Sequence, residues 1–331
     1  IIHLLSRPFD AVLVVGFGGP LGPADVRPFL VNVLRGRRVP PERVEEVARH
    51  YELFGGVSPV TALTRRLADG LAARLRRDGP ALPVFVGMRN WHPLVADTLD
   101  EMARAGIRRA IGFITAAQRS DSSCLQYRDS VRDARHELRR RGRPDVEVTW
   151  VDDWHSHPGF IEANAQHVRD ASGRLPPSCR LEARLVFTAH SIPVSMAGQY
   201  PYREHLLESA RLVAARAEMP DWTLVYQSRS GPPDEPWLEP DICDYLRAEG
   251  ARGLEAAVVC PIGFVSDHIE VLYDLDHQAA HVAQEAGIVL ARARTAGDSP
   301  LFLDAVADIV RQTYRRYERG LPLPIVPLEA S

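Results

Sequence analysis

Eight short apolar runs, separated by stretches with helical spacing, constrain the fold of this chain more than any other feature. Each run is apolar at nearly every position and rich in β-branched residues, which is typical of strands covered on both faces of a parallel sheet. Strands that alternate with helices form right-handed βαβ units, so the sequence predicts a doubly wound α/β fold. The predicted strands cover residues 11–16, 83–88, 108–115, 146–151, 184–190, 223–228, 255–262 and 288–293.

The predicted strands fall into two groups of four, separated by a stretch rich in proline and serine, SGRLPPSC, at residues 172–179. A chain of 331 residues is long enough for about two domains, each with its own core. We therefore expect two similar α/β lobes with a cleft between them. In such sheets ligands bind beyond the carboxyl ends of the strands, so functional residues are expected there.

The bulk composition excludes several classes of protein. A formal net charge of −3 is too small to indicate a nucleic-acid partner or an acidic lipid surface. The four cysteines are scattered without a CxxC pair, so neither a disulfide framework nor a zinc site is expected. The apolar stretch at the amino end is too short for a spanning helix and lacks a cleavage pattern, so a cytoplasmic location is expected.

Two junctions between strands and helices carry local signals. GFGGPLGP, residues 16–23, follows the first strand but has Leu21 where a dinucleotide fingerprint needs its third glycine, so it is expected to be a tight turn. The leucine spacing in TALTRRLADGLAARLRR predicts a helix over residues 61–77. Ser58 followed by Pro59 predicts an N-cap and a proline at the first helical position.

Ionisable side chains gather after two of the predicted strands. TAHSIP closes the fifth strand with His190, and SDHIEVLYDLD follows the seventh. Glu270 and Asp274 stand four residues apart on one helical face, where two carboxylates repel each other unless a cation or a proton lies between them. Oxygen ligands together with imidazole suit a divalent metal such as Fe²⁺. We therefore predict a metal or proton site at Glu270 and Asp274, and a functional rather than structural role for His190.

Two further motifs have less specific interpretations. His155 and His157 in DDWHSHPG form a second histidine cluster, which is expected at the surface because no third partner is evident. The proline-rich loop YQSRSGPPDEPWLEPD, residues 226–241, carries Trp237 and follows the sixth strand. A loop of this length at the functional edge of a sheet is expected to wall the cleft.

Several long motifs in this chain resemble the ferrochelatases: TAHSIP, YQSRSGPPDEPWLEPD and CPIGFVSDHIEVLYDLD, together with VGFGGP, FGGVSPV and SSCLQY. The similarity is closest to soluble Gram-positive, actinobacterial enzymes and runs in order from about residue 9 to 318. It implies two Rossmann-like lobes and insertion of Fe²⁺ into a porphyrin, with coproporphyrin III as the expected substrate. The implied N-terminal lobe covers residues 8–165, with a final helix over 299–318 packing back on it, and the C-terminal lobe covers 166–298.

The resemblance also implies roles for single residues. His190 matches the family's cleft histidine and Glu270 its acidic residue across the macrocycle, so both are implied to be catalytic. Arg35, Ser58 and Tyr127 match positions that hold porphyrin carboxylates in related enzymes. Further substrate contacts are expected from Phe17, His50, Gln118 and Trp237, and metal contacts from His190, Glu270 and Asp274.

This chain departs from the family pattern at five positions: Phe17, His50, Gln118, Asp121 and Gln278. Some relatives have a metal-ligating tyrosine in place of Phe17 and a propionate-binding arginine in place of His50. Relatives commonly carry aromatic or small residues near the ring in place of Gln118 and Asp121, and a further acidic residue of the metal path in place of Gln278. Many actinobacterial relatives also bind a [2Fe–2S] cluster through cysteines in a mid-chain loop and a C-terminal tail. The matching stretches here contain no cysteine, so neither a cluster nor another permanently bound cofactor is expected, and Fe²⁺ is a substrate.

Three alternative functions stay open: a protoporphyrin IX ferrochelatase, a related chelatase for another tetrapyrrole or metal, and a non-catalytic two-lobed metal- or tetrapyrrole-binding protein. The YQSRSGPP and FGGVSP stretches argue against the second, and the missing signal peptide argues against the third. Which of His190 and Glu270 first binds iron and which takes pyrrole protons is also open. We expect porphyrin and Fe²⁺ as partners, no nucleic acid, no integral membrane association, and a monomer.

Overall fold

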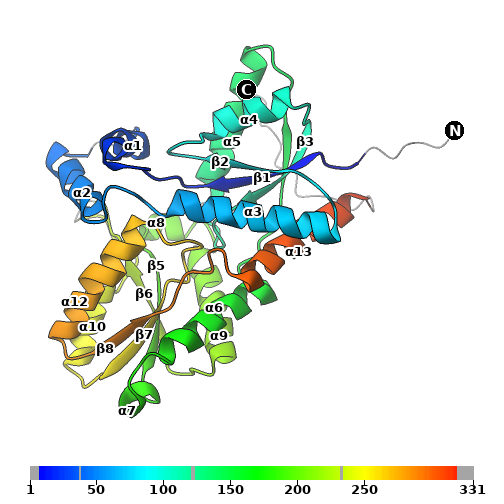
Figure 1. Cartoon of the computed structure of the whole chain (residues 1–331). Coiled ribbons are helices and arrows are strands. Elements are labelled where there is room, and N and C mark those ends of the chain that lie inside the picture. Colours follow the sequence, from blue (N-terminus) through cyan, green and yellow to red (C-terminus); the bar gives the residue numbers. More distant parts are fainter. Residues whose placement is uncertain (1–6, 37–38, 121–123, 232–233, 319–331) are drawn as a thin grey trace. The chain divides into compact units, whose positions relative to one another are not determined.

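The computed structural model describes residues 7–36, 39–120, 124–231 and 234–318 (Figure 1). The chain divides into two compact units. Unit 1 runs to Thr115, resumes over Leu125–Asp152 and again from Leu303, whereas unit 2 comprises Ala116–Cys124 and Asp153–Phe302. The boundary expected between residues 165 and 166 lies inside helix α6 (Pro158–Ser172), all of which belongs to unit 2.

Unit 1 is built on a four-stranded parallel sheet with helices on both faces. Its strands are β1 (Ala11–Gly16), β2 (Val84–Met88), β3 (Arg109–Ile114) and β4 (Glu147–Trp150). Its helices are η1 (Pro23–Asp25), α1 (Val26–Val33), α2 (Pro41–Leu53), α3 (Val60–Asp78), α4 (Val95–Arg104), α5 (Gln126–Arg140) and most of α13 (Pro300–Glu318). The strand order is β2-β1-β3-β4. An added Cβ at Gly16 would meet Thr64 of α3, and one at Gly87 would meet Val95 of α4, so these helices cover opposite faces (Figure 1).

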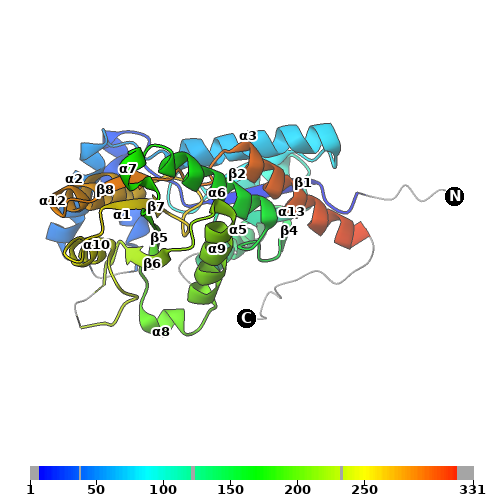
Figure 2. The ribbon, with the colours of Figure 1, turned by 90° about the horizontal axis from the view of Figure 1, so that it is seen from below.

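Unit 2 repeats this plan. Its strands are β5 (Arg184–His190), β6 (Trp222–Gln227), β7 (Ala256–Cys260) and β8 (Val289–Arg292), in the order β6-β5-β7-β8. Its helices are α6, α7 (Pro177–Arg180), α8 (Val194–Ala197), α9 (Tyr202–Ala217), α10 (Ile242–Gly250), α11 (Ile269–Val271), the π-helix η3 (Leu272–Ala279) and α12 (Ala280–Glu285). Helices α6 and α9 pack against each other on the sheet (Figures 1 and 2). Leu246 of α10 and Leu275 of η3 join Val186 and Val259 of the sheet in one buried core.

The predicted strands are confirmed. All eight are present, and no end differs from its prediction by more than two residues. Strands β1 and β7 are buried at every position, which explains why their sequences are apolar throughout rather than alternating. The prediction of two four-stranded parallel sheets flanked by helices is likewise confirmed.

Helix α3 begins one residue later than Ser58 and Pro59 predict. Its N-cap is Pro59, and the N–H of Leu63 donates to the Pro59 carbonyl at 2.9 Å, so helical hydrogen bonding starts there. Ser58 is only 3% exposed, and its N–H donates to the carbonyl of Pro20 at 2.9 Å. The predicted Ser58 cap is therefore wrong, because the serine is held by the turn after β1.

The histidine cluster of His155 and His157 also differs from its prediction, which placed both residues at the surface. His155 is buried, its ring stacks on that of His205 with centroids 3.6 Å apart, and its Nε2 lies 2.8 Å from a carboxylate oxygen of Glu208. His157 is the N-cap of α6, where its Nδ1 accepts from the N–H of Gly159 at 3.2 Å. The surface prediction is wrong for His155, because helix α9, which carries its two partners, packs over it.

From Leu303 onward, α13 is attached to α3 within unit 1. Arg74 pairs with Asp304, and the Arg311 guanidinium donates to the carbonyl of Gly79 at 2.8 Å and to Asp78 at 3.2 Å. These charged contacts flank a close apolar approach, because an added Cβ at Gly70 would collide with the Leu303 side chain.

Candidate active site

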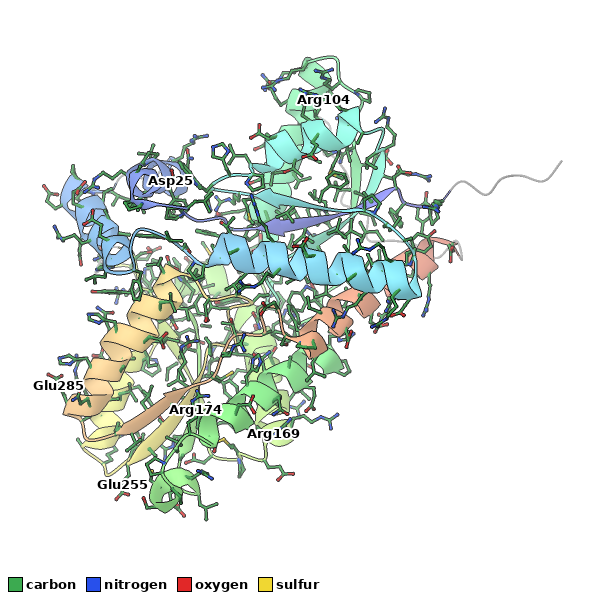
Figure 3. The ribbon with its side chains drawn as sticks, in the orientation of Figure 1. Asp25, Arg104, Arg169, Arg174, Glu255 and Glu285 are labelled. Atoms are coloured by element: carbon green, nitrogen blue, oxygen red, sulfur yellow. The ribbon has the colours of Figure 1, made fainter. Side chains whose placement is uncertain are left out.

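Unit 2 brings ionisable side chains together at the carboxyl ends of β5 and β7. In the order β6-β5-β7-β8 the topology switches between these two strands, which is where open α/β sheets bind ligands. His190 is the last residue of β5, and the segment after β7 leads to His268 and Glu270. At the other edge, the charged groups of Glu255 and Glu285 are exposed to solvent (Figure 3).

The tautomer of the neutral His190 ring is fixed by the backbone carbonyl of the next residue, Ser191. Its Nδ1 makes a short contact with the carbonyl oxygen of Ser191. Because a carbonyl only accepts, Nδ1 carries the hydrogen and Nε2 presents a lone pair. The hydroxyl of Tyr202 donates to the His190 carbonyl at 3.0 Å and fixes the end of the strand. His190 therefore offers an accepting nitrogen at the switch point.

Glu270 lies between two imidazoles. Its Oε2 is 3.9 Å from His190 Nε2 and 3.9 Å from His268 Nδ1. The N–H of Glu270 donates to His268 Nδ1 at 3.2 Å, so the neutral His268 ring carries its hydrogen on Nε2. Burial lowers the pKa of His268, and the nearby carboxylate of Glu270 only partly opposes this. Both nitrogens that face Glu270 are thus acceptors when the rings are neutral.

Asp274 extends the cluster one turn along η3. Its Oδ2 accepts from Gln227 Nε2 at 3.3 Å and from the hydroxyl of Ser228. Ser228 adopts a left-handed conformation, with φ of 61°, which is strained for a residue with a side chain. Burial raises the pKa of Asp274 to about 6, assisted by the negative charge of Glu270 and opposed by the Ser228 hydroxyl. Asp274 therefore exchanges a proton near neutral pH.

The cluster suits proton transfer and can take a metal only with outside ligands. Across the part of the chain that the structure describes, no three His, Cys, Asp or Glu side chains converge as a metal site. The 3.9 Å between His190 Nε2 and Glu270 Oε2 is below the ~4.2 Å that two ligands, each ~2.1 Å from one ion, can span. The remaining ligands of such an ion must come from water or from a bound molecule.

Three residues of the cluster were not predicted as site residues. His268 follows Asp267 in the motif, but its link to Glu270 is an N-cap hydrogen bond that no spacing rule specifies. Gln227 pairs in register with His190 across β5 and β6, so its place next to the histidine depends on the strand order. Tyr202 reaches His190 from α9. The one signal in the sequence was Gln227 itself, because a polar residue that ends an apolar strand faces the functional edge.

Two other predicted substrate contacts lie in unit 2. Gln118 is 3% exposed, and its amide donates to the carbonyl of Ile262 at 3.2 Å. Trp237 pairs through its backbone with Pro193 and packs closely on Gly231. The structure therefore gives Gln118 an internal bracing contact and places Trp237 in the loop that returns beside the residues after His190. Asp121 lies outside the described residues.

The remaining predicted contacts lie in unit 1. Phe17 follows β1 and packs edge-on against Phe29 at 6.2 Å. Arg35 is exposed and donates to the Asn32 side chain at 2.9 Å, and His50 lies in the last turn of α2. Ser58 and Tyr127 are buried, with 3% and 7% of their surface exposed. Arg35 is thus the one of these that presents a charged group to solvent.

Comparison with known proteins identifies the family. A family model described as Ferrochelatase matches residues 9–314. The chain is 47% identical to the coproporphyrin III ferrochelatase of Mycolicibacterium vanbaalenii over 304 residues, which cover 91% of this chain and 89% of that relative. The chain belongs to the ferrochelatase family. It is also 47% identical to the ferrochelatase of Rhodopirellula baltica, over 92% of this chain and 86% of the relative. The family prediction is confirmed, and the enzyme inserts ferrous iron into a porphyrin.

Solved structures support the fold of this ferrochelatase. SirB from Bacillus subtilis with Fe³⁺ aligns with a TM-score of 0.58 at 12% identity, over 95% of this chain and 98% of the other. The sirohydrochlorin chelatase SirB from Bacillus subtilis subspecies spizizenii, in complex with cobalt, aligns with a TM-score of 0.55 at 10% identity, over 94% and 97% of the two chains. Identities this low establish a common fold alone. Within the described residues, no helix is both long enough and apolar enough to cross a bilayer.

Proposed function

We propose that this ferrochelatase inserts Fe²⁺ into coproporphyrin III to give iron coproporphyrin, with His190 and Glu270 as its catalytic residues. The observation that carries the site assignment is the accepting nitrogen of His190, 3.9 Å from the Glu270 carboxylate at the switch point of unit 2. The names of the relatives support the choice of porphyrin. Metalation removes two pyrrole protons and replaces the water shell of the iron, and both steps need bases and oxygen or nitrogen ligands.

A few groups of the cluster share the removal of the pyrrole protons and the replacement of the water shell of the iron. His190 offers a lone pair at Nε2 and Glu270 a carboxylate, so together they handle the iron and the pyrrole protons, in either order. Asp274, with a pKa raised to about 6, takes up a proton near neutral pH and returns it to solvent. Metal contacts are accordingly assigned to His190, Glu270 and Asp274, with further ligands from water and from the porphyrin nitrogens.

Substitution of the two central residues tests the proposal. His190→Ala and Glu270→Gln should each lower the rate of iron insertion by at least ~10²-fold, the usual effect of losing a general acid or base. Porphyrin affinity, measured by fluorescence titration without iron, should stay within about threefold, because ring binding depends on other contacts. His281→Gln, which changes an exposed histidine on α12, is the matched control and should keep full turnover. Near-normal insertion by either central variant would contradict the assignment.

Several expectations remain proposals. Porphyrin contacts are assigned to Phe17, Arg35, His50, Ser58, Tyr127, Gln118 and Trp237. A cytoplasmic location, a monomeric state and the absence of a permanently bound cofactor also remain predictions. The four cysteines of the chain are free thiols, and burial raises the pKa of Cys243 to about 12, which disfavours the thiolate that a cluster needs.

A further inference from the structure

Arg292, the last residue of β8, holds two carboxylates at once. Its Nε and NH2 donate to the two oxygens of Asp276 at 2.5 and 2.9 Å, and its NH1 and NH2 donate to Asp267 at 3.2 and 3.4 Å. Only 15% of the Arg292 side chain is exposed, and 22% and 38% of those of Asp267 and Asp276. A paired guanidinium of this kind has defined geometry, because its planar fork matches two carboxylates.

The two carboxylates that Arg292 holds lie at the two ends of the segment that carries Glu270. Asp267 directly precedes His268, and Asp276 lies on η3 two residues after Asp274. Glu270 lies between them in the chain. Arg292 therefore ties both ends of this segment to the same strand of the sheet, which is itself hydrogen-bonded to β7.

The charges explain why the contacts of Arg292 with both aspartates matter. Asp267 and Asp276 lie within three residues of Glu270 and Asp274 in the chain, and Arg292 is the cation that pairs with both of them. Without it, two partly buried carboxylates lose their partner and repel each other, so the segment must move to hydrate them. A movement of this segment would change the 3.9 Å distance between Glu270 and His190.

We propose that Arg292 is a positioning residue for iron insertion, which holds the segment from Asp267 to Asp276 so that Glu270 stays opposite His190. The inference rests on the proposed function of Glu270. It assigns no contact between Arg292 and either substrate. A misplacement of a catalytic group by about 1 Å can cost ~10²-fold in rate. Loss of the Arg292 contacts should therefore lower turnover more than it lowers porphyrin affinity.

The chain provides a matched control in the same unit. Arg184, the first residue of β5, also bridges two carboxylates, with Nε 2.9 Å from Asp221 and NH1 2.6 Å from Glu249. It stands at the end of β5 opposite His190. Arg184→Gln therefore breaks a comparable bridge without touching the catalytic segment.

The experiment compares Arg292→Gln with Arg184→Gln in the whole protein. We expect kcat of Arg292→Gln to fall by ~10- to 100-fold with porphyrin affinity within about threefold, whereas Arg184→Gln keeps kcat within about twofold. Arg292→Lys, which keeps the charge but loses the fork, should recover part of the loss. Asp276→Asn, which leaves Arg292 bound to Asp267, should fold and show a smaller loss of kcat, and it keeps the test decisive if Arg292→Gln does not fold.

The outcomes separate this inference from the site assignment. If Glu270→Gln is inactive but Arg292→Gln and Asp276→Asn keep the kcat of Arg184→Gln, the positioning role is wrong and the proposed site stands. If Glu270→Gln is active, the proposed site is wrong, and a loss in Arg292→Gln then reflects another residue of the segment. Equal loss of porphyrin affinity and kcat in Arg292→Gln would also overturn a positioning role.

Discussion

The environment of a single carboxylate decides what this site can do. Glu270 faces the lone pair of His190 Nε2 and that of His268 Nδ1, each 3.9 Å from its Oε2. When His190 takes a proton, this arrangement turns into an ion pair whose attraction is about 4 kcal/mol at an effective dielectric constant of ~20, and less in solvent. Nearly half of the Glu270 side chain is exposed, so solvent screens the attraction and also has access to the carboxylate. Glu270 therefore faces both imidazoles and solvent.

A further feature at the scale of single residues is the stacked pair of His155 and His205. His155 and His205 stack with their rings 9° from parallel, and the N–H of Arg119 points at His205 Nδ1 from 3.4 Å. Burial lowers the pKa of His205, and the neighbouring His155 lowers it further. Its folded pKa is below the unfolded value of about 6.5, so its contribution to stability is present above pH ~6.5 and is lost as the pH falls.

We predict that His205→Gln flattens the pH dependence of stability. The free energy of unfolding of the unmodified protein should fall between pH 7.5 and 5.5, and that of the variant should fall less over the same interval. Urea denaturation at both pH values measures this. Arg184→Gln is the control, because it removes a salt bridge of the same unit, to Asp221 and Glu249, that involves no histidine. If His205→Gln lost as much stability on acidification as the unmodified protein, His205 would not titrate as proposed.

At the scale of elements, the position of His190 depends on a glycine in the next loop. Gly263 follows β7, and its N–H donates to the carbonyl of Thr188 in β5 at 3.1 Å. A Cβ added at Gly263 would lie 2.8 Å from the Cα of Ala189 and 2.6 Å from its Cβ. Because the nearest atoms include backbone, the strand end that carries His190 would have to shift.

Gly263→Ala should therefore lower activity and stability together. We expect a loss of about 1–3 kcal/mol in the free energy of unfolding, typical of overpacking, and a fall in kcat of about tenfold or more. Gly198→Ala is the matched control in the same unit, because its added Cβ would meet only ordinary contacts at 3.6 Å and beyond. Full kcat in Gly263→Ala would mean that the end of β5 adapts without moving His190.

The elements also show where sequence patterns succeed. The continuous apolar runs predict β1 and β7 because burial on both faces leaves no room for polar side chains. The sequence places Glu270 and Asp274 on one helical face, but it does not reveal that residues 272–279 form a π-helix. Positions four apart still lie near one face in a π-helix, so the pattern of polar residues does not separate the two forms.

At the scale of the whole molecule, both units share one strand topology. Each sheet has its first strand in second position, so each has a switch point between its first and third strands. The sequence predicts His190 and Glu270 at a functional edge because His190 ends one strand and Glu270 follows another. It does not predict the links through Tyr202 and Arg292, because these are contacts between different elements, nor the link through His268, which depends on the local geometry of an N-cap.

The choice of substrate concerns the whole enzyme, and we predict that coproporphyrin III is strongly preferred over protoporphyrin IX. The first carries four propionates and the second two, so discrimination must come from polar groups that meet the additional carboxylates. Among Arg35, Ser58 and Tyr127, Arg35 alone is exposed, and a charge-assisted hydrogen bond contributes on the order of 1.5–3 kcal/mol. Arg35→Ala should therefore lower kcat/KM for coproporphyrin III by about tenfold or more and leave that for protoporphyrin IX less affected. Parallel measurements of kcat/KM at one detergent concentration test this, and equal or higher efficiency with protoporphyrin IX would contradict the substrate while leaving iron insertion intact.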